Sequence, residues 1–153
     1  MRTLIAFDKF KDSLTAPQAC DLAARALLGV HRGWPSDLCP LTDGGEGFAE
    51  ILTRAAGGEL VPLRVSGPRG ALVSAAIGLV PFAKISPAAR ALLALDPRPQ
   101  DDGLIAVVEM AAASGLALLS PAQRDPWPAS TYGTGPLIRA AADLRAGSRA
   151  PVA

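Results

Sequence analysis

The acidic, glycine-rich loop Asp43–Gly47 (DGGEG) has the residue types of an anion-binding or metal-assisted site. It stands where a strand is expected to end and a helix to begin, and the first N–H groups of a helix attract anions. Asp43 and Glu46 also have the DxxE spacing of a capping box, which needs no ligand. Gly44 and Gly45 fall in the expected first turn of the helix, where each glycine costs about 1 kcal/mol relative to Ala. Close approach of a ligand to the backbone would explain why two glycines stand there. Paired carboxylates suit a phosphate that arrives with a divalent cation such as Mg²⁺.

A second candidate is the charged loop Asp8–Ser13 (DKFKDS), which follows the first expected strand. Lys9 and Lys11 can hold a phosphate or a carboxylate, while Asp8 and Asp12 can take part in proton transfer, metal binding or local hydrogen bonding. A solvated surface loop with alternating charges needs no ligand and stays the alternative interpretation.

The third candidate is the loop Ser130–Gly135 (STYGTG), which offers two threonine hydroxyls and two glycines directly before Pro136. This is the chemistry of a phosphate cradle at a helix N-terminus, but no GKS or GKT follows, so it is not a Walker A motif. A plain glycine turn explains the loop equally well. In the run 109–116 (EMAAASGL), Glu109 ends an expected strand, and the small residues after it suit either helix packing or a ligand. His31 lies at an expected helix C-terminus, so a Ser-His-Asp mechanism is not supported.

The first two loops are expected to follow the strands of a parallel sheet. Thr3–Phe7 is predicted as a buried strand, and the spacing of Thr15 and Gln18 predicts a capped helix after it. Asp37–Thr42 can form a second strand, and a second helix after the acidic loop is expected to stop at Gly57. Alternation of strand and helix predicts a parallel βαβ unit with ligand loops at the carboxyl ends of the strands.

Apolar periodicity predicts which face of each helix is buried. On the first helix the expected buried positions are Ala19, Ala23, Ala26, Leu27 and Val30. On the second helix they are Phe48, Ile51, Leu52 and Ala55.

The pattern changes after residue 62, where we place a boundary between an N-terminal lobe, 1–62, and an incomplete second α/β lobe, 63–153. Residues 63–65 and 71–80 flank the turn SGPRG, and two apolar runs around such a turn predict a hairpin.

A proline-rich excursion, 81–103, with a short helix at 88–95, is expected to interrupt the second lobe. A buried strand at 104–109 and a last helix at 136–144 complete it. The predicted fold class is therefore α/β, with a Rossmann-like parallel βαβ first lobe and part of a second, mixed α/β lobe.

The composition excludes several classes of protein. Of 153 residues, 50% are hydrophobic and 19% charged, which is typical of a globular chain and not of a disordered one. A net charge of +1 gives no basic surface for a nucleic acid. Charged residues soon after the first apolar run predict no signal peptide, so we expect a cytoplasmic protein, and no apolar stretch reaches the roughly 20 residues of a membrane span. Cys20 and Cys39 lack metal-binding spacing and are expected to be structural.

Taken together, the blocks IAFDKFKDSLTA, LTDGGEGF, EMAAASGL and STYGTGPLIRAA resemble, in this order and spacing, the bacterial glycerate kinase family. The resemblance runs from Arg2 to about Ala142. It implies two α/β lobes with a cleft between them, ATP and Mg²⁺ as cosubstrates, and transfer of the γ-phosphate to D-glycerate, with 2-phosphoglycerate favoured over 3-phosphoglycerate.

The resemblance also implies site residues. The residues that match the family's loops are Asp8, Lys11 and Ser13, then Asp43, Gly44, Gly45, Glu46 and Gly47, and finally Thr131, Tyr132, Gly133, Thr134 and Gly135. Among these, Asp43 and Glu46 are the candidates for Mg²⁺ binding or base catalysis, and Lys11 for holding the substrate carboxylate or a phosphate.

Two departures from the family pattern stand out. Lys9 and Asp12 replace a serine and a glycine that are typical of the first loop. Members that resemble this chain are also more than twice as long, so we expect the N-terminal portion of a truncated member. The alternative to a kinase is therefore a catalytically inactive fragment that acts at most as a ligand-binding or partner-dependent module. Apolar surface left open on such a fragment would favour self-association or a complementing chain.

Overall fold

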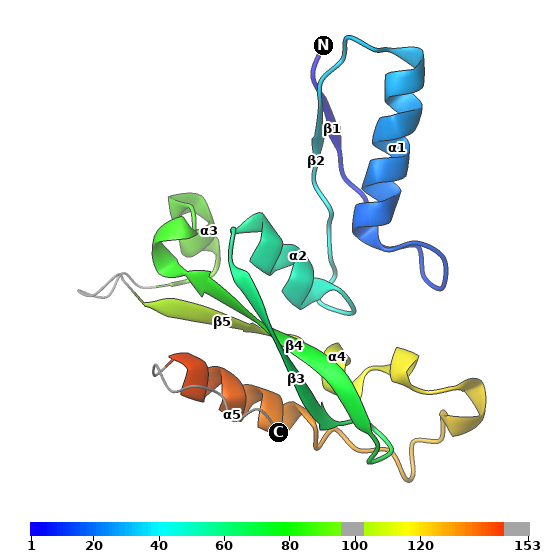
Figure 1. The fold of residues 1–153 in the computed structure, drawn as a ribbon, viewed down its shortest axis with the longest axis vertical. Helices are drawn as coiled ribbons and strands as arrows, with labels where there is room; N and C mark the ends of the chain where they lie inside the picture. Colours follow the sequence, from blue (N-terminus) through cyan, green and yellow to red (C-terminus); the bar gives the residue numbers. More distant parts are fainter. Residues whose placement is uncertain (96–102, 146–153) are drawn as a thin grey trace.

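A computed structural model describes residues 1–95 and 103–145 of the chain. Its N-terminal part is a βαβ unit in which strands β1 (Thr3–Ile5) and β2 (Ser36–Leu38) are parallel and helix α1 (Ala16–Val30) connects them. Figure 1 shows this unit standing apart from the remaining elements, with the N-terminus at its far end. The parallel βαβ prediction is confirmed, although both strands are shorter than predicted.

Helix α1 begins as its sequence predicts. The Thr15 side chain accepts from the backbone N–H of Gln18, whose side chain accepts from the N–H of Thr15, so the capping box is present. Small side chains on one face let the helix approach β1 closely, and Cys20 is fully buried with its thiol 3.6 Å from the Ile5 carbonyl oxygen. Cys20 and Cys39 are both free.

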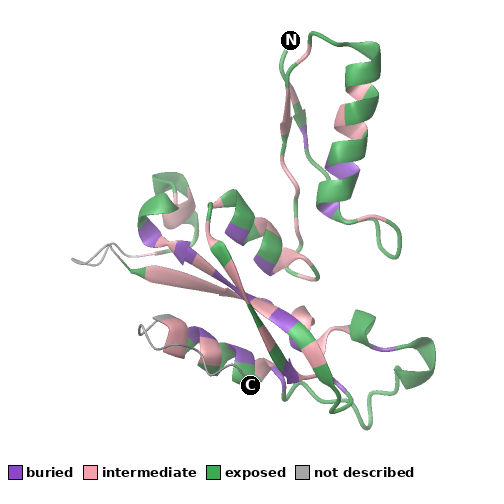
Figure 2. Ribbon diagram, viewed as in Figure 1, coloured by how far each residue is buried: buried purple, intermediate pink, exposed green. Residues whose placement is uncertain are grey.

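The predicted buried face of α1 is only partly right. Ala19 is buried, but Ala26 and Val30 are exposed, Val30 by 75%. Leu4 on β1 is likewise 67% exposed, because its neighbour Ile5 points to the helix and successive strand residues alternate between faces. Figure 2 shows how few residues of this unit are buried compared with the rest of the chain. Parallel sheets are ordinarily covered on both faces, whereas among the described residues α1 is the helix that packs on β1 and β2.

The second sheet is antiparallel and has the order β3-β4-β5 in the described residues. Its strands are β3 (Glu59–Ser66), β4 (Leu72–Pro81) and β5 (Leu104–Val108). Strands β3 and β4 pair from Glu59↔Leu79 to Ser66↔Leu72 around the turn that the sequence predicts, so the hairpin is confirmed.

Helices cover both faces of this sheet. Helix α2 (Phe48–Ala55) lies on one face and helix α5 (Thr134–Arg145) on the other, with the short helix α4 (Ala111–Ser114) at the end of β5 (Figure 1). The core lies between the sheet and α5, and its buried members are Val65, Ala75, Ile77, Ala113, Leu137 and Ala141. Burial of these apolar side chains is the main stabilising term of the described structure.

The buried face of α2 differs from the predicted one. Ala49 and Thr53 are buried, whereas Leu52 is exposed. Thr53 is fully buried because Gly78 in β4 lacks a side chain at the contact, where an added Cβ would lie 1.8 Å from Thr53 Oγ1. Small side chains therefore set this face of the helix against the sheet, and the larger Phe48 and Ile51 are only partly buried.

The change of sheet does not fall at residue 62, whereas the excursion lies where it was predicted, between the end of β4 at Pro81 and the start of β5 at Leu104. Residue 62 lies inside β3, and α2 packs on the second sheet, so the change of sheet falls between β2 and α2. After β4 the chain forms a 3₁₀ turn, Phe82–Lys84, and helix α3 (Pro87–Leu92), which begins one residue before the predicted helix and ends three residues earlier. Residues 96–102 of the excursion lie outside the described part.

Two further 3₁₀ turns, Leu116–Leu118 and Pro121–Gln123, precede the third candidate loop, and α5 begins two residues earlier than predicted. Among the described residues, no helix combines the length and the apolar character that a membrane crossing requires.

Leu137 and Ile138 in α5 test the position of the core. Leu137 is fully buried and Ile138 is 58% exposed. We expect Leu137→Ala to lower the free energy of unfolding by about 2–5 kcal/mol, because it leaves a cavity, and Ile138→Ala to change it by less than about 0.5 kcal/mol. Urea denaturation of the two variants measures both values, and equal losses would contradict the described packing.

Candidate functional site

The acidic loop Asp43–Gly47 lies between β2 and α2, and the capping box that its DxxE spacing allows does not form. Helix α2 begins at Phe48, and its N-cap residue is Gly47. Gly47 has no side chain to accept a hydrogen bond from the first N–H groups of the helix. Asp43 Oδ1 instead accepts from the N–H of Gly45 at 2.9 Å, closing a turn within the loop. Gly44 and Gly47 have φ of +91° and +90°, a left-handed conformation that glycine adopts without strain. The loop's own backbone therefore accounts for Gly44, which the sequence had suggested serves close ligand approach.

Glu109 caps α2 from a distant part of the chain. Its Oε1 accepts from the N–H of Gly47 at 3.3 Å and its Oε2 from the N–H of Ala49 at 3.1 Å. The Glu109 residue is only 7% exposed, so these bonds and the positive end of the helix offset the cost of burying its charge. The first N–H groups of α2, which the sequence offered to a phosphate, are thus occupied by a carboxylate.

Lys9 joins the charged loop to the acidic loop. Its ammonium group donates to Asp43 Oδ1 at 2.7 Å and lies 3.9 Å from Asp8 Oδ1. The bond from Lys9, together with the N–H of Gly45, lowers the pKa of the Asp43 carboxyl, and the same bond raises the pKa of Lys9. The ion pair is therefore lost as the pH falls through the lowered pKa of Asp43, and also as the pH rises through the raised pKa of Lys9.

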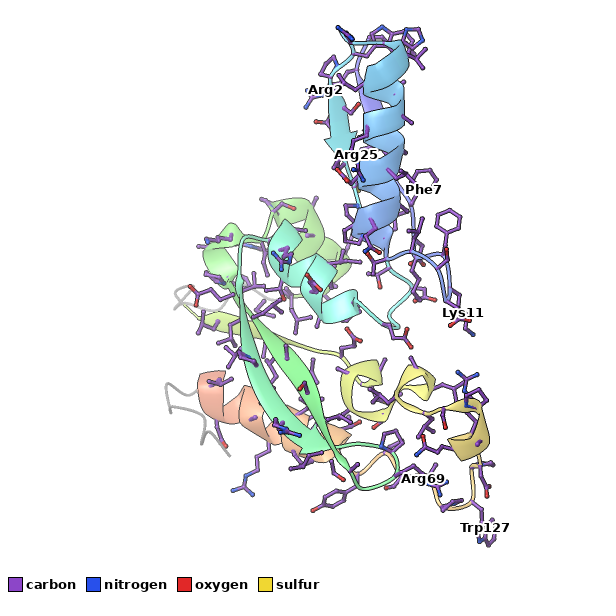
Figure 3. The ribbon with its side chains drawn as sticks, turned by 45° about the vertical axis from the view of Figure 1, so that its right-hand side comes forward. Arg2, Phe7, Lys11, Arg25, Arg69 and Trp127 are labelled. Atoms are coloured by element: carbon purple, nitrogen blue, oxygen red, sulfur yellow. The ribbon has the colours of Figure 1, made fainter. Side chains whose placement is uncertain are left out.

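A groove of about 490 Å³ lies where these two loops meet α1 and α2. The predicted site residues that line it are Lys11, Ser13, Glu46 and Gly47, and Lys9 lines it as well. Lys11 lies at the lower end of the βαβ unit in Figure 3, in the loop between β1 and α1. Asp8, Asp43, Gly44 and Gly45 are not among the lining residues. The structure thus brings two lysines to one groove with the acidic residues Asp12, Glu46 and Glu50. The lysines are the groups there that suit a phosphate or a carboxylate.

Backbone and side-chain packing account for much of the third loop. An added Cβ on Gly133 would lie 1.7 Å from the carbonyl oxygen of Ser66, so only glycine fits there. The hydroxyl groups of Thr134 and Ser114 are 2.8 Å apart and share a hydrogen bond. Gly135 has no neighbour within 4 Å of an added Cβ, and Tyr132 is exposed. Gly135 is therefore the glycine of this loop at which a ligand can approach the backbone.

A second groove, of about 570 Å³, lies beside this loop. Its polar lining residues are Ser114, Arg124, Asp125, Ser130 and Thr131, and the remaining lining residues are apolar. Ser130 and Thr131 are the members of the third loop that line it, and the two grooves share no lining residue. The structure therefore brings the first two loops together and places the third loop at a different groove.

Sequence reasoning missed two contributions. It treated Glu109 only as the end of a strand, although a buried glutamate requires hydrogen-bond partners and so indicates a cap or an ion pair. It did not single out Arg124, because an arginine in an irregular segment carries no pattern that reveals which residues surround it.

The carboxylates of this region do not fit a resident metal ion. Asp43 is bonded to Lys9, and in the described ranges no three His, Cys, Asp or Glu side chains gather as metal ligands. A Mg²⁺ ion bound mainly by phosphates and water needs fewer protein ligands, so the need for Mg²⁺ stays a prediction.

Comparison with known proteins identifies relatives of the whole described chain. The sequence model of the Glycerate kinase family matches residues 3–149. A protein of Bacillus subtilis (strain 168), named Glycerate kinase, is 37% identical over 146 residues, which cover 95% of this chain and 33% of that protein. The Glycerate 2-kinase of Escherichia coli (strain K12) is 32% identical over 138 residues, covering 90% of this chain and 31% of that protein.

A solved structure from Salmonella typhimurium LT2, described as glycerate kinase 2, has a TM-score of 0.61 and 36% identity to this chain. The match covers 97% of this chain and 34% of that one. This chain thus spans about a third of the length of the curated relatives it matches.

Glu109 provides the test of this site's architecture. We expect Glu109→Ala to lower the free energy of unfolding by about 1–3 kcal/mol, because the N–H groups of Gly47 and Ala49 lose their acceptor. Glu109→Gln keeps one oxygen and the shape of the side chain, so its loss should be smaller. Thermal denaturation followed by circular dichroism gives both values, and a Glu109→Ala variant as stable as the parent chain would contradict the cap.

Proposed function

The chain belongs to the glycerate kinase family, and from this membership we propose that its loops contribute to phosphoryl transfer from ATP to a hydroxyl group of D-glycerate. Relatives named Glycerate kinase and Glycerate 2-kinase support this substrate and favour 2-phosphoglycerate as the product. Because the chain spans about a third of those relatives, the proposal concerns what its own residues supply.

The observation that carries the proposal is the groove between the first two loops. Lys9, Lys11 and Glu46 line the same cavity of about 490 Å³, although 34 residues or more separate the lysines from the glutamate in the sequence. Phosphoryl transfer depends mainly on positioning and on neutralising phosphate charge, with a carboxylate to accept the proton of the attacking hydroxyl.

Glu46 is the better candidate for the base, because Asp43 is already bonded to Lys9. In the proposed step the oxygen of the glycerate hydroxyl bonds to the γ-phosphorus, and the Glu46 carboxylate takes the proton of that hydroxyl. The bond from that phosphorus to the β–γ bridging oxygen breaks, and ADP leaves with the electron pair. Lys11 neutralises phosphate charge or holds the glycerate carboxylate.

The second groove suits a further anionic group of the same reaction. The guanidinium of Arg124 and the hydroxyls of Ser114, Ser130 and Thr131 are donors for a carboxylate or a phosphate. Gly135, open to close approach, begins the first turn of α5 with Thr134. We assign this groove to substrate binding and not to proton transfer, because no catalytic carboxylate lines it except Asp125, whose Oδ1 accepts from the N–H of Trp127.

One observation favours the alternative, a partner-dependent module without activity of its own. The βαβ unit leaves apolar side chains exposed on both its sheet and its helix, at Leu4, Leu22, Leu28, Val30 and Leu38. Exposed apolar side chains gathered on one small unit favour an interaction with another chain. We propose that it supports self-association or a complementing chain.

Phosphorus NMR of the 153-residue chain with ATP, Mg²⁺ and D-glycerate tests the kinase proposal. We expect a 2-phosphoglycerate signal whose rate of formation falls about 10²–10⁴-fold in Glu46→Gln, because that variant cannot accept the proton. Glu59→Gln, an exposed glutamate on β3 outside both grooves, is the matched control and should keep the parent rate. Absence of product from a chain shown to be folded by circular dichroism would reject the kinase proposal for this chain.

Size-exclusion chromatography with light scattering tests the alternative. We expect the chain to run above the mass of a monomer, and Leu4→Glu to shift it toward the monomer by placing a charge on the exposed strand. Leu72→Glu is the control, because Leu72 is a comparably exposed leucine of the second sheet, 62% against 67% for Leu4. A parent chain that is monomeric at all concentrations, or equal effects of both variants, would reject this surface as the site of self-association.

A further inference from the structure

The ammonium group of Lys9 is surrounded by carboxylates from two loops. It donates to Asp43 Oδ1 at 2.7 Å and lies 3.9 Å from Asp8 Oδ1. Glu46 also contributes to the raised pKa of Lys9, so its charge acts on the same group. The Lys9 side chain is only 24% exposed, whereas the side chain of Asp43 is 64% exposed. The positive charge of Lys9 thus lies among negative charges from both loops.

This environment has the chemistry of a cation site. Carboxylate oxygens are the ligands that divalent cations such as Mg²⁺ and Mn²⁺ prefer. The orientation of Asp43 is fixed, because its Oδ1 also accepts from the N–H of Gly45. An added Cβ at Gly45 would lie 3.1 Å from Asp43 Oδ1 and 3.4 Å from Lys9 Nζ, so the glycine leaves room for this arrangement.

We propose that Lys9 is a positioning residue whose ammonium group takes the place of a divalent cation between Asp8 and Asp43. It neutralises the two carboxylates and fastens the charged loop to the acidic loop, which shapes the groove that Lys11 and Glu46 line. A metal ion that arrives with phosphates is then kept away from Asp43. The inference goes beyond the proposed kinase function, and its test needs neither nucleotide nor activity.

The test is a titration of Mn²⁺ into the 153-residue chain without nucleotide, followed by electron paramagnetic resonance of the free ion. Lys9→Ser removes the ammonium group and opens its space, so it should bind one Mn²⁺ at least about tenfold more tightly than the parent chain. Lys9→Met also removes the ammonium group but keeps a side chain of similar length, and it too should bind Mn²⁺ more tightly than the parent chain. Lys9→Arg retains the charge and should behave like the parent.

Two further variants test whether Asp43 is responsible for the tighter Mn²⁺ binding of Lys9→Ser. Asp43→Asn added to Lys9→Ser should abolish the tighter Mn²⁺ binding. Lys11→Ser removes a lysine of the same loop that does not contact Asp43, and should leave the Mn²⁺ affinity unchanged. The proposal is overturned if both Lys9 variants bind Mn²⁺ no more tightly than the parent, if Lys11→Ser gives the same gain, or if the parent itself has a Mn²⁺ site that Asp43→Asn removes.

Discussion

The Glu109 carboxylate is the contact on which the geometry of the candidate site depends. It stands at the end of β5 and accepts from the N–H groups of Gly47 and Ala49 at the start of α2, which lie 62 and 60 positions away in the sequence. A buried charge without such partners would cost several kcal/mol, so strand and helix must keep this arrangement. Because the acidic loop runs directly into α2, fixing the start of the helix also fixes that loop.

Charge pairing extends this constraint to the first loop. Lys9 binds Asp43, and the resulting groove collects Lys11, Ser13 and Glu46 from both loops. An exposed ion pair alone contributes little to stability, so its effect here is mainly on the position of the loops. The third loop is set by different contacts, a glycine against the Ser66 carbonyl and a hydroxyl pair with Ser114, and it lies at another groove. The chain thus holds two groups of candidate binding residues. The first two loops precede Glu109 in the sequence, and the third loop follows it.

Local sequence patterns predicted most of the elements. The capping box of Thr15, the hairpin around SGPRG and the stop at Gly57 depend on residues close in sequence, and all three are present. Burial was predicted less well. Val30 fits an apolar stripe yet is exposed, and Thr53 is buried because Gly78, on a different element, admits it. Which side of a helix is covered depends on its neighbours, and periodicity does not identify them.

For the site, the sequence by itself identified the three loops and the chemistry of their residue types. Charge, hydroxyl groups and glycine are visible in any sequence, and their order along the chain carries the resemblance to the family. Only the tertiary structure decided their arrangement: Glu109 occupies the helix N-terminus that seemed open to phosphate, and Lys9 engages Asp43. Position 133 admits only glycine because the carbonyl oxygen of Ser66 lies against it, whereas nothing lies within 4 Å of a Cβ added at Gly135. These outcomes follow from contacts between distant residues, whose distances are set by the packing of the whole chain and not by local pattern.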